Sequence, residues 1–356
     1  MTATIDVLVV DDSPLMQRLI TKLLESDTSI RVVSTAADGY EAIEKVKCIR
    51  PDVLTLDIEM PRLDGLDALQ HIMKHTPTPI IILSGAMERD AAMQALEMGA
   101  VDFVAKPSGI ISIDLYKIRE KLIKKVKLAT LVNPKCITGD TGPVIIPTPT
   151  LIPPKNITLG NQWLIAIGAS TGGPRALNKI ISGLPPDLPA SMLIVQHMPA
   201  NFTKSFAQRL NNHSPLHVTE ATHGQRITSG VVYIAPGGVH TAIAKKNHHL
   251  VINIQDTPPV NSVRPSADVL MNSIVKLQWP RLIGILLTGM GNDGADGLAK
   301  IKAAGGHTIA QDKDSSTIFG MPKAAIQRGV VDETLPLNQI PSAIIKLIQK
   351  SECHDR

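Results

Sequence analysis

Aromatic residues are scarce in this chain of 356 residues, because Phe, Trp and Tyr together make up only 3% of it. Its hydrophobic cores must therefore be built from aliphatic side chains, a composition that suits buried parallel strands flanked by helices. Cysteine is also rare: Cys48, Cys136 and Cys353 lie far apart without paired metal-ligand spacing. Three scattered cysteines make a poor disulfide framework, so we expect a reducing compartment.

Long apolar runs are missing as well. No stretch reaches the roughly 18 apolar residues of a membrane span, and no signal-peptide pattern opens the chain. We therefore expect a cytoplasmic protein without membrane insertion. The length exceeds what one hydrophobic core usually serves, which predicts two domains.

The first 128 residues alternate apolar, β-branched runs with helical stretches five times. The expected strands are residues 5–10, 30–33, 53–56, 80–83 and 101–104. This alternation predicts an α/β domain of the flavodoxin-like (βα)5 type in residues 1–128, whose ligands bind at the carboxyl ends of the parallel strands. Residues 129–160 hold six prolines and no periodicity, which predicts a semi-rigid, proline-rich linker.

A second alternation of strands and helices occupies residues 161–356. The expected strands are residues 163–168, 192–196 and 282–287, with a β-rich middle at 231–254 and helices starting near Pro174, Asn201, Ser266 and Asp293. We expect a doubly wound, mostly parallel α/β domain with an antiparallel insertion around residues 237–254.

Polar side chains follow four of the five expected strands in the first domain. Asp11 and Asp12 follow the first strand, Asp57 the third, Ser84 the fourth and Lys106 the fifth. Because the carboxyl ends of parallel strands meet at one sheet edge, these residues should converge. Carboxylates there would hold Mg²⁺, and one of them would accept a phosphoryl group. An Asp after a strand often only caps a helix, but capping does not account for all five residues.

Three strings in this domain carry a family resemblance: D-D-S-P at residues 11–14, D-I-E-M-P-R-L-D-G at 57–65 and K-P at 106–107. They resemble the response-regulator receiver domain over about the first 120 residues. The resemblance implies Asp57 as phosphoacceptor, Asp11, Asp12 and Asp57 as Mg²⁺ ligands, Lys106 as phosphate contact and Ser84 as the switch hydroxyl. It also implies that Phe103 is the aromatic switch, for which a plain core residue is an equal alternative.

In the second domain, a glycine-rich turn at residues 168–174, G-A-S-T-G-G-P, links a predicted strand to a predicted helix. The turn exposes Ser170 at a helix N-terminus, where backbone N–H groups can stabilise an oxyanion or bind an anion. Taken alone, the string has three interpretations: a phosphate loop that lacks the G-x-G-x-x-G spacing, a G-x-S-x-G nucleophile elbow, or glycines that serve tight packing.

A serine nucleophile needs a nearby base. Of the 11 histidines, His197 directly follows the next strand and so should lie at the same sheet edge as Ser170. The other histidines are expected on the surface or in loops, and His240 is the least ordinary of them. Asp293 follows a third strand, where it would orient the imidazole, although a helix cap is the alternative. The predicted triad is Ser170, His197 and Asp293, an order that differs from that of α/β-hydrolases.

Four strings of this domain are G-A-S-T-G-G-P, Q-H-M-P, R-P-S-A-D-V-L and L-T-G-M-G-N-D-G-A-D-G. They resemble the catalytic domain of the chemotaxis protein-glutamate methylesterases, and with the receiver and linker the resemblance covers nearly the whole chain. It implies a phosphorylation-regulated serine esterase that hydrolyses glutamate γ-methyl esters on chemoreceptors, releases methanol and also deamidates glutamines. The implied roles are Ser170 as nucleophile, His197 as base and acid, Asp293 as orienting group, and the backbone N–H groups of Thr171 and Met290 as oxyanion hole.

The resemblance further implies two partners: methyl-accepting chemotaxis receptors as substrates and a chemotaxis histidine kinase as phosphodonor. It implies Mg²⁺ in the receiver and no cofactor at the esterase site. Two other classes stay open: a response regulator whose second domain, with 18 basic and 12 acidic residues, binds DNA, and an unrelated phospho-regulated hydrolase of small esters. The basic residues are spread out and no helix-turn-helix pattern appears, so we expect no nucleic-acid partner.

Overall fold

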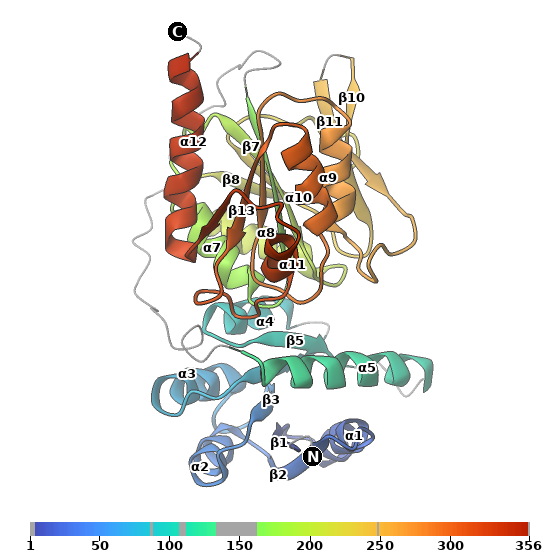
Figure 1. Ribbon diagram of the computed structural model, residues 1–356. Helices are drawn as coiled ribbons and strands as arrows, with labels where there is room; N and C mark the ends of the chain where they lie inside the picture. The colour runs from blue at the N-terminus through green and yellow to red at the C-terminus, as the bar shows by residue number, and fades with distance from the viewer. Residues whose placement is uncertain (1–3, 86–87, 107–111, 133–161, 248, 355–356) are drawn as a thin grey trace. The chain divides into compact units, whose positions relative to one another are not determined.

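The computed structural model describes residues 4–85, 88–106, 112–132, 162–247 and 249–354. The chain divides into two compact units, Met1–Thr141 and Gly142–Arg356 (Figure 1). The division falls inside the predicted linker 129–160, of which residues 133–160 lie outside the described part, as does Pro107 of the K-P string. No helix of the described residues is both long and apolar enough to cross a membrane.

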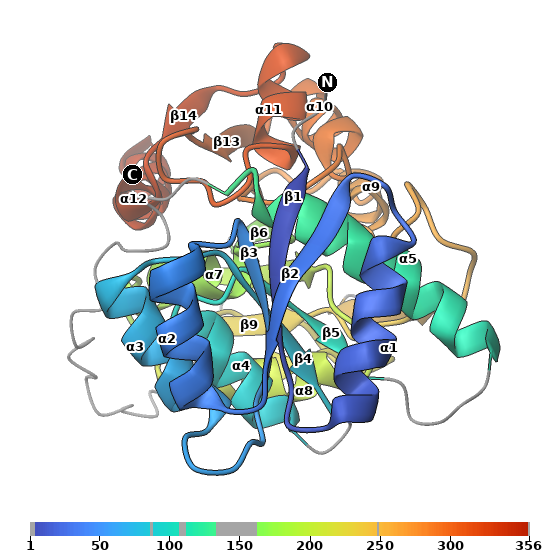
Figure 2. The ribbon, with the colours of Figure 1, turned by 90° about the horizontal axis from the view of Figure 1, so that it is seen from below.

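The first unit is a five-stranded parallel sheet in the order β2-β1-β3-β4-β5. Its strands are β1 (Ile5–Val10), β2 (Ile30–Ala36), β3 (Val53–Asp57), β4 (Ile80–Ser84) and β5 (Asp102–Ala105). Its helices are α1 (Pro14–Glu25), α2 (Gly39–Ile49), α3 (Gly65–His75), α4 (Arg89–Glu97) and α5 (Ser112–Ala129). Figure 2 shows α1 and α5 on one face of the sheet and α2, α3 and α4 on the other. This arrangement confirms the predicted (βα)5 fold.

Local sequence explains these elements. Strands β3 and β4 are buried along their whole length, which is why both read as continuous apolar runs instead of alternating patterns. Helix α1 begins after Ser13, whose hydroxyl accepts from the Met16 N–H, so Ser13 is the helix cap and Asp12 is not.

The second unit is built on a seven-stranded sheet in the order β14-β13-β12-β6-β7-β9-β8, in which every ladder is parallel. Its strands are β6 (Trp163–Ala169), β7 (Ala190–Gln196), β8 (His217–Glu220), β9 (Val231–Ile234), β12 (Leu282–Leu286), β13 (His307–Gln311) and β14 (Glu333–Leu335). Strands β10 (His240–Lys246) and β11 (His249–Gln255) form a separate antiparallel pair, which confirms the predicted insertion.

Helices cover both faces of this larger sheet. They are α7 (Gly173–Ser182), α8 (Phe202–Asn212), α9 (Ala267–Val275), α10 (Ala295–Ala303), α11 (Met321–Gln327) and α12 (Ile340–His354), with a short 3₁₀ turn at Leu337–Gln339. Helix α7 packs against α8 and α12, whereas α10 packs against α9 and α11 (Figure 1). The chain leaves β6 toward β7 on one side and later returns to pair β12 on the other side. The carboxyl ends of β6 and β12 therefore form a topological switch point, where doubly wound sheets commonly bind ligands.

Candidate functional site

Three carboxylates gather at the carboxyl edge of the first sheet. Ligand oxygens of Asp11, Asp12 and Asp57 all lie within 4.8 Å of one another. Asp11 and Asp57 are buried and Asp12 is exposed. Asp11 Oδ2 is a buried oxygen that accepts no hydrogen bond among the described residues, although Lys106 Nζ lies 3.0 Å away. A carboxylate cluster with an unsatisfied oxygen and one exposed member fits the hard oxygen ligands that Mg²⁺ prefers.

Lys106 completes this cluster, with its Nζ 2.6 Å from Asp57 Oδ1. Burial raises the pKa of Asp57 to about 6, and the charge of Asp11 adds to this effect while Lys106 opposes it. For Lys106, burial lowers the pKa, but the contact with Asp57 outweighs it and holds the pKa above its usual value. The cluster is therefore short of positive charge, which a divalent cation would supply.

The two predicted switch residues lie on the neighbouring strands. Ser84 is fully buried at the end of β4, and its Oγ donates to the carbonyl oxygen of Gly85 at 3.1 Å. Phe103 on β5 is only 3% exposed, with Lys125 Nζ 5.2 Å from its ring centre. In this conformation Phe103 is a core residue, and the switching roles of both residues stay predictions.

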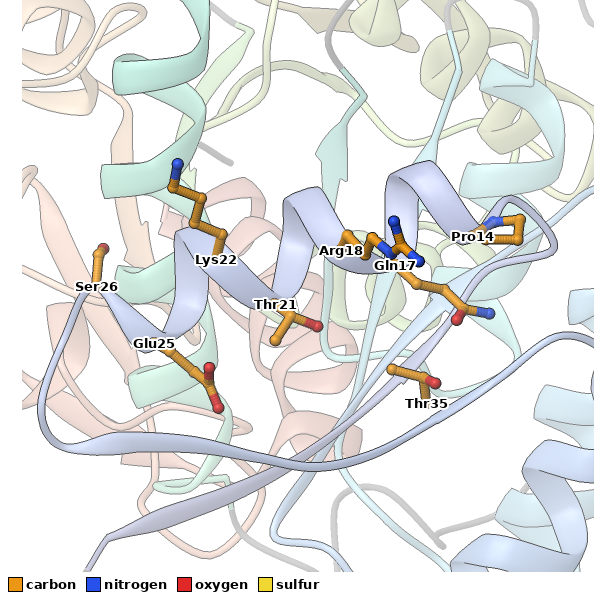
Figure 3. Close-up of a pocket in the computed structure, with 8 residues that line it drawn as sticks. All are labelled: Pro14, Gln17, Arg18, Thr21, Lys22, Glu25, Ser26 and Thr35. Carbon is orange, nitrogen blue, oxygen red and sulfur yellow. The ribbon is translucent and has the colours of Figure 1, made fainter.

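A separate pocket of about 780 Å³ lies along α1 of the first unit (Figure 3). Its lining residues are Pro14, Gln17, Arg18, Thr21, Lys22, Glu25, Ser26 and Thr35. None of the predicted site residues lines it. The pocket is therefore distinct from the acidic cluster.

In the second unit, Ser170 and His197 each lie one residue beyond the end of adjacent strands. The last residues of β6 and β7, Ala169 and Gln196, are partners in the parallel ladder. The His197 N–H donates to the Ala169 carbonyl at 3.0 Å, and the Gln196 side-chain amide donates to the Ser170 carbonyl at 3.0 Å. The predicted convergence of Ser170 and His197 on one sheet edge is what the register produces.

Two glycines let the chain turn at Ser170. Gly172 has φ of +78°, and a Cβ there would lie 2.3 Å from Thr317 Oγ1. A Cβ on Gly289, after β12, would lie 2.6 Å from the Cβ of Ser170. Both positions require glycine for space, and Gly172 also requires it for its backbone conformation. Tight packing and exposure of the serine are thus served by the same turn.

His197 and Asp293 form a close pair, with 2.8 Å between His197 Nε2 and Asp293 Oδ2. Burial raises the pKa of Asp293, but the hydrogen bond and charge of His197 outweigh it and hold this pKa below its usual value. Because an ionised carboxylate only accepts, Nε2 of His197 donates and Nδ1 is left as the proton acceptor. No hydrogen bond joins Ser170 Oγ to His197 within the described part of the chain. Catalytic hydrogen bonds of this kind commonly tighten only when substrate binds.

Asp293 is held by the N-terminus of helix α9. Its carboxylate accepts from Ser266 Oγ at 2.5 Å, from the Ala267 N–H at 2.6 Å and from the Asp268 N–H at 3.4 Å. The free N–H groups and positive dipole end of a helix favour an anion at this position. Sequence reasoning predicted Ser266 only as a helix start and missed this contact. The R-P-S-A-D-V-L string was the available signal.

The structure overturns one sequence expectation. His240 was expected on the surface or in a loop, but it is the first residue of β10 and is 0% exposed. Its Nδ1 accepts from the Ser266 N–H at 3.2 Å, and its Nε2 lies 3.0 Å from the Pro258 carbonyl oxygen. His240 therefore supports the loop and helix start that hold Asp293.

The two residues predicted to form the oxyanion hole flank the serine. The backbone N–H of Met290 makes no hydrogen bond within the described residues, and the Met290 side chain is 42% exposed. Thr171 is buried, and its carbonyl accepts from Thr288 Oγ1 at 2.9 Å. Their part in stabilising an oxyanion stays a prediction.

A strand-edge serine beside a His–Asp pair, on a chain that also carries an acidic phosphoacceptor-like cluster, defines the class of receiver-linked serine hydrolases. Comparison with family models agrees: the CheB methylesterase model matches residues 165–344, and the response regulator receiver domain model matches residues 7–115. The chain belongs to the CheB methylesterase family. It is a methylesterase whose receiver domain implies regulation by phosphorylation.

The chain is similar to named relatives over almost its whole length. It is 44% identical to the protein-glutamate methylesterase/protein-glutamine glutaminase of Symbiobacterium thermophilum over 97% of both chains. It is 43% identical to that of Pyrococcus horikoshii over 97% of this chain and 94% of the relative. The crystal structure of the Thermotoga maritima CheB methylesterase catalytic domain matches with a TM-score of 0.51 and 42% identity, covering 52% of this chain and 98% of that chain.

These matches decide between the classes that the sequence left open. The predicted family and the two-domain α/β fold are confirmed. A DNA-binding second domain finds no support, because the methylesterase model spans most of the second unit.

Proposed function

We propose that the chain hydrolyses glutamate γ-methyl esters on methyl-accepting chemotaxis receptors and deamidates receptor glutamines, using Ser170, His197 and Asp293, under control of phosphorylation at Asp57. The observation that carries this proposal is the 2.8 Å contact between His197 and Asp293 directly beside Ser170. Its support from outside the chain is the double name, methylesterase and glutaminase, that the relatives bear.

In the first half of the reaction, Ser170 Oγ attacks the ester carbonyl carbon while His197 Nδ1 takes the hydroxyl proton. Asp293 stabilises the resulting imidazolium through its hydrogen bond to Nε2. The oxyanion faces the backbone N–H groups of Thr171 and Met290. Collapse of this intermediate breaks the bond to the methoxy oxygen, to which His197 returns the proton, so that methanol leaves and an acyl-enzyme remains.

In the second half, water attacks the acyl-enzyme while His197 again takes a proton. The ester bond to Ser170 breaks, the serine recovers its proton and the glutamate carboxylate is released. A glutamine side chain would follow the same course with ammonia as the leaving group. One site can therefore serve both reactions that the relatives' name describes.

In the receiver, Asp57 accepts the phosphoryl group as an acyl phosphate from a chemotaxis histidine kinase. Asp11, Asp12 and Asp57 would hold Mg²⁺, which neutralises the charge of the transferring group. Lys106, 2.6 Å from Asp57, would contact the phosphate. Ser84 and Phe103 would carry the change to the surface of the unit. With a kinase and receptor signalling regions as partners, the proposal places the protein in the cytoplasm.

The test is release of methanol from a peptide that copies a methylated receptor segment, with the peptide product identified by mass spectrometry. The full chain should convert the methyl ester to the free acid far faster than it hydrolyses a small ester such as a nitrophenyl acetate. A strong preference for the small ester would favour an unrelated hydrolase instead.

A fluorophosphonate should label the wild-type chain at a single serine, and Ser170→Ala should abolish both labelling and hydrolysis. Ser182→Ala is the matched control: this serine lies on the same helix, where its hydroxyl donates to the Asn178 carbonyl. Near-normal turnover in Ser170→Ala would remove the nucleophile assignment.

A further inference from the structure

The turn between β11 and α9 reaches the catalytic carboxylate through one side chain, that of Asn261. Val260 and Val263 pair across this turn, and Asn261 and Ser262 between them have φ of +52° and +62°. Two successive left-handed residues form the tight hairpin type in which Asn is a favoured first residue. The turn thus fixes the backbone from which the Asn261 side chain extends.

The side-chain amide of Asn261 lies between two carboxylates. Its Nδ2 donates to Asp268 Oδ2 at 2.8 Å and to Asp293 Oδ1 at 3.2 Å. Both partners act as acceptors, so the nitrogen of the amide, and not its oxygen, must face them. One NH₂ group with two protons therefore bridges the two acids.

Asp268 makes this bridge necessary. It is only 4% exposed, and its Oδ1 accepts from the Gly297 N–H at 2.6 Å. Burial raises its pKa, and the nearby charge of Asp293 raises it further. Without donors between them, two such carboxylates would raise the negative potential around each other.

We propose that Asn261 is a positioning residue of the hydrolysis, which fixes the Asp293 carboxylate toward His197 and keeps the His197 imidazole from becoming too basic to be neutral at working pH. This inference rests on the proposed role of the Ser170 triad. A general base works best when its pKa lies near the operating pH. The Asn261 amide partly neutralises Asp293 and screens it from Asp268, so the imidazolium beside Asp293 is stabilised less than an unscreened pair of acids would stabilise it.

Other charged groups around the pair are accounted for. Asp268 on α9 and Asp296 on α10 are the acids that face it from the packed helices. His240 on β10 has both ring nitrogens engaged, by the Ser266 N–H and the Pro258 carbonyl. Arg264, on the same loop as Asn261, is engaged with Asp256 Oδ1 at 2.8 Å. The described contacts therefore leave the Asn261 amide as the group that separates the two buried acids.

The test is an NMR titration of the His197 imidazole in the full chain, in wild type and in Asn261→Gly and Asn261→Asp. Gly and Asp both tolerate a positive φ, so neither change strains the turn. Loss of the amide should raise the pKa of His197 by about half a unit or more, since neighbouring charges shift pKa values by about one unit and upward. The acidic limb of the pH profile of kcat/KM should move up with it, and kcat at neutral pH should fall about tenfold with little change in KM.

Ser262→Gly is the matched control, because this neighbour shares the left-handed backbone but its side chain makes no hydrogen bond among the described residues. It should leave the His197 pKa unchanged. His197→Gln assigns the resonance, and thermal unfolding identifies any variant that fails to fold. An unchanged His197 pKa in both Asn261 variants overturns the inference. Absence of methylesterase activity in the wild type would instead reject the proposed function, because the titration does not depend on the substrate.

Discussion

Replacing Asp293 by Asn tests how the carboxylate of the proposed triad works, because the two side chains have the same shape. Asp293 Oδ2 accepts from His197 Nε2 and from the Ala267 N–H, while Oδ1 accepts from Ser266 Oγ. The backbone N–H of Ala267 cannot turn away, whereas the hydroxyl of Ser266 can rotate. An Asn side chain should therefore point its oxygen at Ala267 and His197 and its NH₂ at Ser266. His197 then keeps its tautomer, and the variant loses charge more than geometry.

The size of the loss follows from the burial of the pair. The His197 and Asp293 side chains are 10% and 3% exposed, so solvent screens their interaction weakly. Opposite unit charges about 4 Å apart interact by ~4 kcal/mol at the effective dielectric constant of about 20 that suits such sites. This attraction appears only when His197 is protonated, as it is in the transition state. Its loss should slow hydrolysis by roughly 10³-fold.

Methanol release from the methylated peptide measures this effect, and the thermal unfolding midpoint shows whether the variant is folded. Ser170→Ala should lose more activity than Asp293→Asn, because it removes the nucleophile itself. Two results would refute the reasoning: a folded Asp293→Asn enzyme within about tenfold of wild type, or one as inactive as Ser170→Ala.

Other changes test the turn, the receiver and one ion pair. Gly172→Ala should lower the free energy of unfolding by about 2–3 kcal/mol, because it is both strained and crowded, whereas Gly305→Ala, at φ of +82° with open space, should lose only about 1 kcal/mol; equal losses in thermal unfolding would contradict the crowding argument. Asp57→Asn should abolish Mg²⁺-dependent phosphate uptake and any response of the esterase rate to a small phosphodonor, and acid-stable label elsewhere in the wild type would argue against an aspartyl phosphate. Lys127 Nζ lies 2.6 Å from Asp27, whose pKa its hydrogen bond helps to lower from 3.8 to about 2. A lowered folded pKa contributes stability above the unfolded value, so the destabilisation caused by Lys127→Met should be full above about pH 4 and vanish as pH falls through about 2; a pH-independent difference in melting temperature would mean that packing, and not charge, was lost.

Much of the fold follows from local sequence. Strand β1 matches its predicted range, and the other strands expected in the first unit lie within three residues of theirs, because each is a run of aliphatic residues buried in a parallel sheet. Helix α10 begins at Ala295, two residues after the predicted start, because Gly294 takes φ of +90° and leaves Asp293 in the turn. The short strand β14 was not predicted, since only its pairing with β13 defines it.

The site was predictable to the extent that strand ends determine it. Ser170, His197 and Asp293 each follow a strand, and parallel register brings such positions to one edge. The donors that hold Asp293 were not predictable, because Asn261 and Ser266 come from a loop and a helix start whose placement against β12 is decided by tertiary packing. Burial of His240 was missed for the same reason.

The strand order of the second unit also bears on how the protein acquires activity. Strand β6 pairs with β7 early in the sequence, but its other neighbour, β12, starts more than a hundred residues after β6 ends. Pairings so distant in sequence form late, because a long loop must close before they are rewarded. Ser170 and His197 can meet as soon as the first two strands associate, whereas Asp293 arrives only after β12 has docked. A nascent chain therefore carries a complete receiver before it has a working esterase, and activity appears only when the whole second unit has folded.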